Sequence, residues 1–333
     1  MDTALLFGGR SFLGGHICRV LVNRGYNVLL HSRSTADFRN LQDIIPDAAI
    51  EPVVCDFDEL ERIQQLCDRS QFVIYAAIPY YKQSIGQSET FRKDLIQLES
   101  ILNIIAASKV KKSVFVSVSG TIGRVSGGCS DETHEMCEDA AGGWGHVKQK
   151  LASESLILQH AKDGLRAVIV NPSMCIGEFD TKPSTGEIFR FFSLFPFSLM
   201  PEKRVNIVDV EDVAMGTVLA LEKGVSGQRY ILSGTNTTMG ALIRRIKKLK
   251  GKPTPRFTVS RWMAVLTAYL FEVLNMIARR PTPVVPLLGI ELIEHGSQHL
   301  TCEKAMKDLG FKPRDAWTSV DRSYHWYVKH GIL

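Results

Sequence analysis

The stretch FGGRSFLGG (7–15) decides the fold of this chain. It follows an apolar run that ends at Phe7 and opens a helix-like stretch that begins at Phe12. Gly8 permits a tight turn, and Gly14 lets the helix pack close to its strand, while the helix start presents unpaired N–H groups. The middle small position is Ser11, so the pattern reads G-x-x-S-x-x-G. A strand, this turn and a helix together predict a binding site for the pyrophosphate of a dinucleotide.

Short apolar runs alternate with helical periodicity throughout the first half, which predicts βαβ units and a parallel sheet. The expected strands are Thr3–Phe7, Asn27–His31, Ile50–Val54, Phe72–Ala76, Ser113–Val118 and Ala167–Val170. The expected helices are Phe12–Arg24, Glu59–Asp68, Thr90–Ser108 and Lys148–Ala161. Right-handed crossovers would place helices on both faces of the sheet. The expected fold is therefore α/β, a doubly wound parallel sheet of the Rossmann type.

The pattern changes after residue 170, where prolines and aromatic residues become frequent. The strand-like pieces Val205–Val208 and Arg229–Leu232 are expected to return to the main sheet. We therefore expect a dinucleotide-binding domain over residues 1–171, with returning strands near 205–234. Residues 172–204 and 235–333 would form a smaller, mostly helical substrate-binding lobe.

The end of the second expected strand indicates which dinucleotide is bound. Folds that prefer NAD place a carboxylate there to bind the ribose hydroxyls. Here the stretch reads HSRS (31–34), with Arg33 and no carboxylate, and Arg10 of the glycine-rich loop can reach the same volume. Guanidinium groups bind phosphate, so the sequence favours NADPH, with NADH as the alternative.

Several motifs together resemble the extended (atypical) short-chain dehydrogenase/reductase family, also described as the NAD-dependent epimerase/dehydratase superfamily. FGGRSFLGG is similar to the family's TGxxGFxG, and CDFDEL (55–60) to its GDLxD stretch. Further matches are YAA (75–77), NPSMCIGEFDTKPSTGEI (171–188), NIVDVEDVAMG (206–216) and KAMKDLGFKP (304–313). The likeness is to the dihydroflavonol reductase, 3β-hydroxysteroid dehydrogenase and hopanoid-associated sugar epimerase branches, and it covers nearly the whole chain.

The resemblance implies a set of cofactor-binding residues. In the family the aspartate at the position of Asp56 and the next backbone amide hold the adenine. The alanine-rich end of the fourth strand lies beside the cofactor. The residues expected to bind the cofactor are Gly8, Arg10, Ser11, Phe12, Leu13, Gly14, Arg33, Asp56, Phe57, Ala76, Ala77, Lys148, Asn171, Pro172 and Ser173.

Family chemistry uses a Tyr-x-x-x-Lys pair, in which the lysine binds the nicotinamide ribose and lowers the pKa of the tyrosine. WGHVKQKLASE (144–154) stands where relatives have YGxSKxxAE, so Lys148 matches the lysine and Trp144 takes the tyrosine position. An indole N–H donates but does not titrate usefully, so Trp144 cannot be the general acid. We expect it to offer a stacking surface to the substrate.

The sequence offers more than one residue for the upstream serine and for the proton donor. SVFVSVSGTIG (113–123) aligns Ser117 with the first serine of relatives and Val118 with the usual catalytic one. Strand alternation puts Ser117 and Ser119 on one face, and we take Ser119 as the catalytic serine. Tyr80 is the expected proton donor, with Tyr81 beside it as a substrate contact. His146, His134 and Cys137 are alternatives, although His146 would point away from positions 144 and 148 on a helix.

Composition limits the remaining classes. The chain is 45% hydrophobic and 23% charged with a net charge of +5, which is ordinary globular composition and gives no indication of nucleic-acid binding. Seven scattered cysteines predict reduced thiols, a cytoplasmic location and no metal site. The N-terminus does not resemble a signal peptide. The segment Trp262–Ile277 is too short and too polar to span a bilayer.

The stretch LIRRIKKLKGK (242–252) is amphipathic with basic outer positions. With the nearby apolar segment Trp262–Ile277, it predicts either a buried helix beside a solvated basic face, or an apolar lid or peripheral membrane contact that serves a lipophilic substrate. The resemblance also implies a homodimer paired through the helices Thr90–Ser108 and Lys148–Ala161.

These observations predict an oxidoreductase of secondary metabolism with an atypical active site, which uses NADPH to reduce a lipophilic or aromatic carbonyl, enone or quinone-type substrate. Two alternatives stay open: a catalytically silent nucleotide-binding sensor or partner protein, and a sugar-nucleotide epimerase.

Overall fold

The computed structural model describes residues 1–33, 39–41, 48–77, 88–136, 145–181, 186–194, 203–252 and 298–333. Its helices are α1 (Phe12–Asn23), α2 (Leu60–Asp68), α3 (Ser88–Ala107), α4 (Gly145–Lys162), α5 (Gly186–Leu194), α6 (Val210–Lys223), α7 (Met239–Leu249), α10 (Glu303–Leu309) and α11 (Ala316–Lys329), with short 3-10 helices η1 (Arg39–Leu41) and η2 (Ser119–Thr121). Its strands are β1 (Thr3–Phe7), β2 (Asn27–Ser32), β3 (Ile50–Val54), β4 (Phe72–Tyr75), β5 (Lys112–Val116), β6 (Ala167–Pro172), β7 (Met174–Ile176), β8 (Arg204–Asp209), β9 (Arg229–Leu232) and β10 (Thr235–Thr238).

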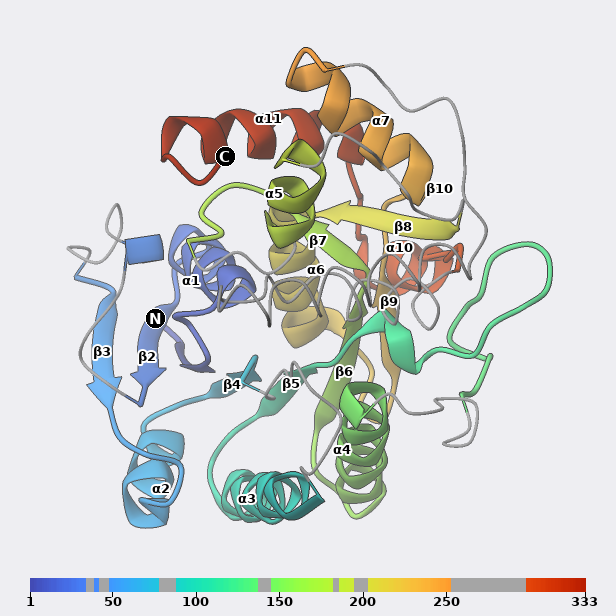
Figure 1. Ribbon diagram of the computed structural model, residues 1–333. Helices are drawn as coiled ribbons and strands as arrows, with labels where there is room; N and C mark the ends of the chain where they lie inside the picture. The colour runs from blue at the N-terminus through green and yellow to red at the C-terminus, as the bar shows by residue number, and fades with distance from the viewer. Residues whose placement is uncertain are drawn as a thin grey trace.

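Within these ranges, seven parallel strands form the central sheet in the order β3-β2-β1-β4-β5-β6-β9 (Figure 1). The predicted doubly wound α/β fold is therefore confirmed, and each strand and helix expected in the first half occurs with its ends shifted by three residues or fewer. The chain order reverses between β1 and β4. In such sheets the ligand binds outside the carboxyl ends of the strands at this switch point.

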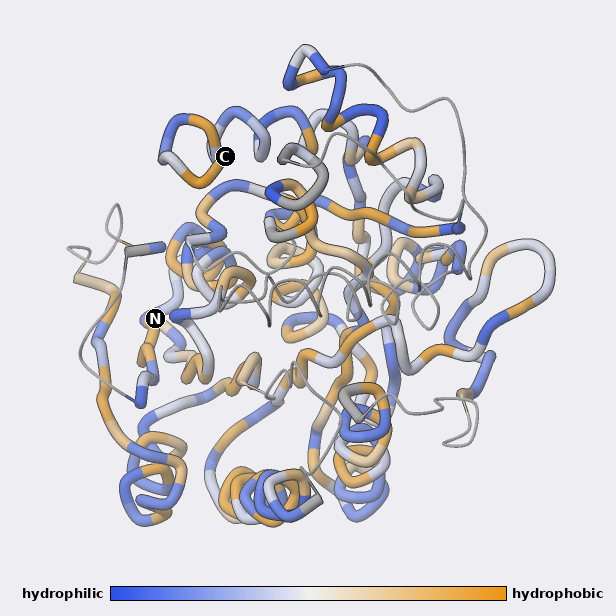
Figure 2. The backbone as a smooth tube through the Cα atoms, viewed as in Figure 1, coloured by the Kyte–Doolittle hydropathy of each residue, from blue (hydrophilic) through white to orange (hydrophobic). Residues whose placement is uncertain are grey.

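Two helical layers cover the two faces of the sheet. Helices α1, α6 and α10 pack on one face and α2, α3 and α4 on the other, as Figure 1 shows. Successive residues of β1 alternate between the two cores, with Leu6 in the first and Leu5 in the second. Because both faces are covered, the strands are nearly continuous apolar runs rather than alternating ones, and Figure 2 shows them as mostly hydrophobic.

One sequence expectation about the sheet is wrong. Arg229–Leu232 joins the central sheet as β9, but the predicted strand Val205–Val208 does not return there. It forms part of β8 in a separate sheet of the described residues, ordered β10-β8-β7. The reason is that β9 already occupies the edge of β6, so β8 pairs in parallel with β7 and antiparallel with β10 instead.

The smaller sheet carries a separate, third hydrophobic core, which includes Phe189, Ile207, Ile243, Val320 and Tyr327 from α5, β8, α7 and α11. This part of the molecule lies in the upper part of the view in Figure 1, where the chain passes from the end of β6 into β7. Among the helices that the structure describes, none is both long enough and apolar enough to cross a membrane. The segment Trp262–Ile277 lies outside the described residues.

Candidate cofactor and active site

The glycine-rich loop has the tight geometry that its sequence predicts. Gly8 has a φ of +82°, and a Cβ at this position would lie 2.5 Å from the carbonyl oxygen of Ala76 at the end of β4. A Cβ on Gly14 would lie 2.1 Å from the carbonyl oxygen of Gly8. Both contacts are far too short for a side chain, so the loop requires glycine at both positions. The loop therefore lies directly against β4, at the switch point of the sheet.

The start of α1 is left with unpaired donors. Ser11 is the N-cap, and its Oγ accepts a hydrogen bond of 2.9 Å from the N–H of Gly14. The N–H groups of Phe12 and Leu13 meet no acceptor within the part of the chain that the structure describes. A twelve-residue helix that directs unpaired N–H groups at a glycine-rich loop fits the pyrophosphate of a dinucleotide.

Two guanidinium groups lie near the end of β2. The Nη1 of Arg10 donates to the Oγ of Ser32 at 3.2 Å, and the exposed Arg33 follows in the chain. His31 points to the opposite face, where Phe57 stacks at 4.8 Å, and burial lowers the pKa of His31 to about 4. The imidazole is therefore neutral at physiological pH, and the positive charge at this site comes from the arginines.

The loop after β3 carries Asp56 and Phe57, which are expected to bind the cofactor. The N–H of Asp56 donates to a carboxylate oxygen of Glu59 at 2.6 Å, while the Asp56 side chain itself is exposed. Phe57 is buried among aromatic rings beneath the strand ends. Ala76 and Ala77, also expected to line the cofactor, are partly buried beside Gly8. Tyr80, Tyr81 and Trp144 lie outside the described residues, so their roles stay predictions.

The two serines after β5 differ in their surroundings. The strand ends at Val116, so the alternation expected as far as Val118 does not apply to Ser117 and Ser119. Ser117 is buried and donates its hydroxyl to the carboxylate of Glu154. Ser119 begins η2 and is half-buried, and its hydroxyl has no partner among the described residues. Of the two, Ser119 keeps a hydroxyl that a substrate can use.

The two lysines of α4 also differ. Lys148 is half-buried and has no polar partner within the described ranges. Lys150 is only 6% exposed, and its Nζ donates to the carbonyl oxygen of Val116 at the end of β5. Burial lowers the pKa of Lys150 to about 7, and the carboxylate of Glu154 acts in the opposite direction.

The sequence analysis did not identify Lys150 and Glu154. The signal that could have found them is spacing: in YGxSKxxAE the lysine precedes the glutamate by four residues, as Lys150 precedes Glu154, whereas Lys148 does not. The buried side of α4 also follows this register, since Val147, Lys150, Glu154 and Ile157 are all nearly inaccessible.

The residues expected after β6 are inside the protein. Asn171 is fully buried, and its Nδ2 donates to Glu154 at 2.8 Å. Ser173 donates to the Oδ1 of Asn206 in β8 at 2.6 Å, which joins the end of the central sheet to the smaller sheet. Pro172 lies between them in a fully buried strand. These three residues hold the strand ends in place.

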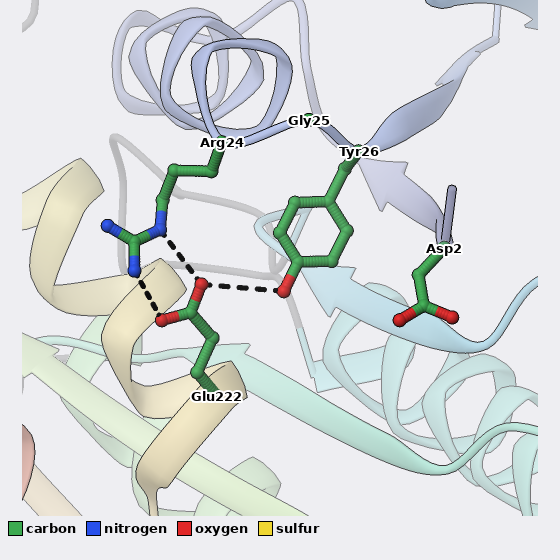
Figure 3. Close-up of a pocket in the computed structure, with 5 residues that line it drawn as sticks. All are labelled: Asp2, Arg24, Gly25, Tyr26 and Glu222. Atoms are coloured by element: carbon green, nitrogen blue, oxygen red, sulfur yellow. Dashed lines mark hydrogen bonds and ion pairs between the residues drawn. The ribbon is translucent and has the colours of Figure 1, made fainter.

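A surface pocket lies at the other end of the sheet (Figure 3). It is lined by Asp2, Arg24, Gly25, Tyr26 and Glu222, at the amino ends of β1 and β2. Arg24 donates to both carboxylate oxygens of Glu222, at 2.8 and 2.6 Å, and so ties α1 to α6. These groups satisfy one another, and the pocket lies away from the glycine-rich loop.

Comparison with known proteins agrees with this geometry. The model of the NAD dependent epimerase/dehydratase family matches residues 4–233. The chain is 28% identical over 339 residues to a putative dihydroflavonol 4-reductase of Synechocystis sp., covering 100% of this chain and 96% of that protein. It is 23% identical over 333 residues to sterol demethylase protein B of Methylococcus capsulatus, covering 99% and 100%. The crystal structure of gox2253 superposes with a TM-score of 0.83 at 26% identity, covering 100% of both chains. The chain thus belongs to the NAD dependent epimerase/dehydratase family and is an NAD(P)-dependent oxidoreductase.

Proposed function

We propose that this protein is an NADPH-preferring reductase of a lipophilic or aromatic carbonyl, enone or quinone-type substrate. The observation that carries the cofactor preference is the contact between Arg10 and Ser32. It brings a guanidinium from the glycine-rich loop to the end of β2, where Arg33 adds a second one and Asn27–Arg33 contains no carboxylate. Paired guanidinium groups suit the 2′-phosphate of NADPH, because they bind phosphate through several charge-assisted hydrogen bonds.

The chain's residues have distinct roles in this proposal. The loop Gly8–Gly14 and the start of α1 hold the pyrophosphate, and Asp56 holds the adenine. We favour Lys150 over Lys148 as the lysine of the site, because the Nζ of Lys150 reaches the carbonyl oxygen of Val116 at the end of β5, three residues before Ser119. When bound, NADPH supplies a hydride to the acceptor carbon, and a proton must reach the product from a side chain or water. Ser119 orients the acceptor oxygen, and Tyr80 remains the proposed proton donor.

The substrate class rests on two considerations. The residue four positions before Lys150 is His146 and the residue four positions before Lys148 is Trp144, so neither register places a tyrosine in the site. An activated double bond or a quinone ring requires such a phenol less than a simple ketone does. Relatives that cover most of this chain are named cinnamoyl-CoA reductase 1 and sterol-4-alpha-carboxylate 3-dehydrogenase, decarboxylating; the first name contains an aromatic acyl group and the second a sterol skeleton.

Cofactor titration by tryptophan fluorescence tests the cofactor assignment. NADPH and NADH are compared in the wild type, Arg33→Ala and Lys150→Ala, with Lys148→Ala as the comparison for the other lysine of α4. We expect tight NADPH binding that weakens about 10-fold or more in Arg33→Ala, since a charge-assisted bond contributes about 1.5–3 kcal/mol. Equal binding of NADH by the wild type would contradict the NADPH preference. Binding without oxidation of NADPH by any enone, quinone or ketone would favour the silent nucleotide-binding alternative.

A peripheral contact with an anionic membrane fits a lipophilic substrate, and we include it in the proposal. Ala241, Arg244, Arg245 and Lys248 of α7 and Trp317 of α11 line one surface pocket. Figure 2 shows the outer side of α7 as hydrophilic. The apolar side of α7 is buried in the core of the smaller sheet, so a membrane contact would be electrostatic. Each basic residue near the surface would contribute about 1 kcal/mol to the binding free energy. The homodimer through α3 and α4 likewise remains a proposal; α3 exposes Ile96 on its surface.

A further inference from the structure

A single buried carboxylate oxygen joins three segments near the candidate site. Glu154 of α4 is 2% exposed, and its Oε1 accepts hydrogen bonds from Ser117, Thr121 and Asn171. The bonds from Thr121 and Asn171 are 2.7 and 2.8 Å long. Ser117 follows β5, Thr121 lies in η2 and Asn171 lies near the end of β6. Glu154 therefore connects helix α4 to the backbone segments on either side of Ser119.

Cationic groups lie on both sides of this carboxylate. The Oε2 of Glu154 is 3.4 Å from the Nη1 of Arg229 at the start of β9. Lys150 stands one helical turn before Glu154 and is buried with it. Farther out, Arg229 donates to the carbonyl oxygen of Glu132 at 3.0 Å, and the ammonium of Lys304 from α10 donates to the carbonyl oxygen of Arg229 at 2.8 Å.

A buried carboxylate is costly unless hydrogen bonds and a cation compensate it, and here both are present. Asn171 belongs to the same network as Glu154. Its Nδ2 donates to Glu154, Thr121 and the carbonyl oxygen of Val118, while its Oδ1 has no partner in the described part of the chain. Neutralising Glu154 would thus loosen several donors at once around the strand ends.

We propose that Glu154 is a positioning residue of the reductase site. It fixes Asn171 and the segment that carries Ser119 against α4, and it places a buried carboxylate one helical turn from Lys150. The inference deepens the proposed function and rests on it. Glu154 acts through Lys150 and Ser119 and need not touch cofactor or substrate.

Kinetics of Glu154→Gln provide the first test, with Gln149→Ala as the matched control. Gln149 is also a buried polar residue of α4, but it donates to Asp94 of α3 at 2.9 Å and does not join the Glu154 network. In Glu154→Gln we expect kcat to fall about 10- to 100-fold while KM for NADPH stays within about threefold. In Gln149→Ala both constants should stay within about threefold, even with a similar loss of thermal stability. If kcat fell equally in the two variants, Glu154 would have only a structural role, and the proposal would be overturned.

A second readout does not need turnover. Lysine labelled with carbon-13 at Cε reports the titration of Lys150 by NMR, with the resonance assigned through Lys150→Arg. Removing the negative charge in Glu154→Gln should move the titration midpoint of Lys150 to lower pH, because the carboxylate favours the ammonium. An unchanged midpoint would contradict the inference. If the wild type oxidises NADPH with none of the enones, quinones and ketones tested, the proposed function fails. The titration midpoint of Lys150 then decides by itself whether the charge of Glu154 acts on Lys150.

Discussion

Arg10 and Ser32 are 22 positions apart in the chain, yet the Nη1 of Arg10 lies 3.2 Å from the Oγ of Ser32. The contact joins the glycine-rich loop after β1 to the end of the neighbouring strand β2. In the proposed cofactor position, it places a positive charge at the adenosine ribose, where the two common dinucleotides differ. The contact therefore leads to a direct prediction about cofactor choice.

Replacing Arg10 should change NADPH binding and leave NADH binding nearly unaltered. We expect Arg10→Ala to raise the Kd for NADPH about 10- to 100-fold, because one charge-assisted contact to the phosphate is lost. Arg10→Lys should recover part of the affinity, since an ammonium keeps the charge without the planar fork. Isothermal titration with both cofactors measures this. A parallel loss of NADH affinity would mean that Arg10 supports the loop rather than reads the phosphate.

Ser11 should be replaceable by glycine and not by alanine. Ser11→Ala removes the acceptor of the Gly14 N–H and should lower the free energy of unfolding by about 1 kcal/mol. Glycine at an N-cap costs only a few tenths of a kcal/mol, so Ser11→Gly should unfold at nearly the wild-type urea concentration. If both variants lost the same stability, the cap would not be the reason that serine stands here.

His31 should make the protein sensitive to acid. Its pKa is about 4 in the folded protein and 6.5 ordinarily, because burial disfavours the imidazolium. Between these values the unfolded chain binds more protons, so stability rises with pH from about 4 to 6.5 and is lost on acidification. His31→Phe, which keeps an aromatic ring beside Phe7 and Phe57, should flatten this dependence. Urea unfolding at pH 5 and pH 7 measures it, and an equal pH slope in both proteins would contradict the assignment.

Lys150 should act on stability in a separate, more alkaline window. Its pKa falls from 10.5 to about 7 on folding, so the unfolded chain again binds more protons between these values. Stability should therefore rise as the pH increases from about 7 towards 10.5, relative to a Lys150→Met variant. Lys148→Met serves as the control, because Lys148 is only half-buried. A constant difference between wild type and Lys150→Met over this range would argue against a buried, neutralised lysine.

Binding to anionic vesicles should depend on the outer face of α7. Arg244→Glu with Lys248→Glu should abolish flotation with vesicles that contain phosphatidylserine, because both side chains are exposed. Lys247 is 1% exposed and Arg245 is ion-paired with Asp321, so reversing either charge would test folding instead. Vesicles of phosphatidylcholine alone are the control. Equal recovery of wild type and double variant on anionic vesicles would end the membrane proposal.

Much of the fold could be predicted because local signals and burial agree. Apolar runs bounded by glycine and polar residues gave β1, β3 and β9 at their observed ends, and the caps and periodicity gave α1 to α4. The sheet predicted for the strand Val205–Val208 was wrong, because pairing depends on which strand edge is already occupied. The pairing of β9 with β6 cannot be predicted from the local sequence of either strand.

The sequence alone determined the dinucleotide loop, since only glycine tolerates the backbone of Gly8 and the contact at Gly14, and this requirement is local. It also identified Arg10 and Arg33, and it showed that tryptophan rather than tyrosine stands four residues before Lys148. Only the tertiary structure decided which lysine of α4 is buried, which serine keeps its hydroxyl available, and that Glu154 joins β5, η2 and β6. Those relationships depend on how α4 is rotated about its axis and on strand ends that meet only in the folded protein. Side chains far apart in the chain become hydrogen-bond partners there, because the core excludes the water that would otherwise bind them.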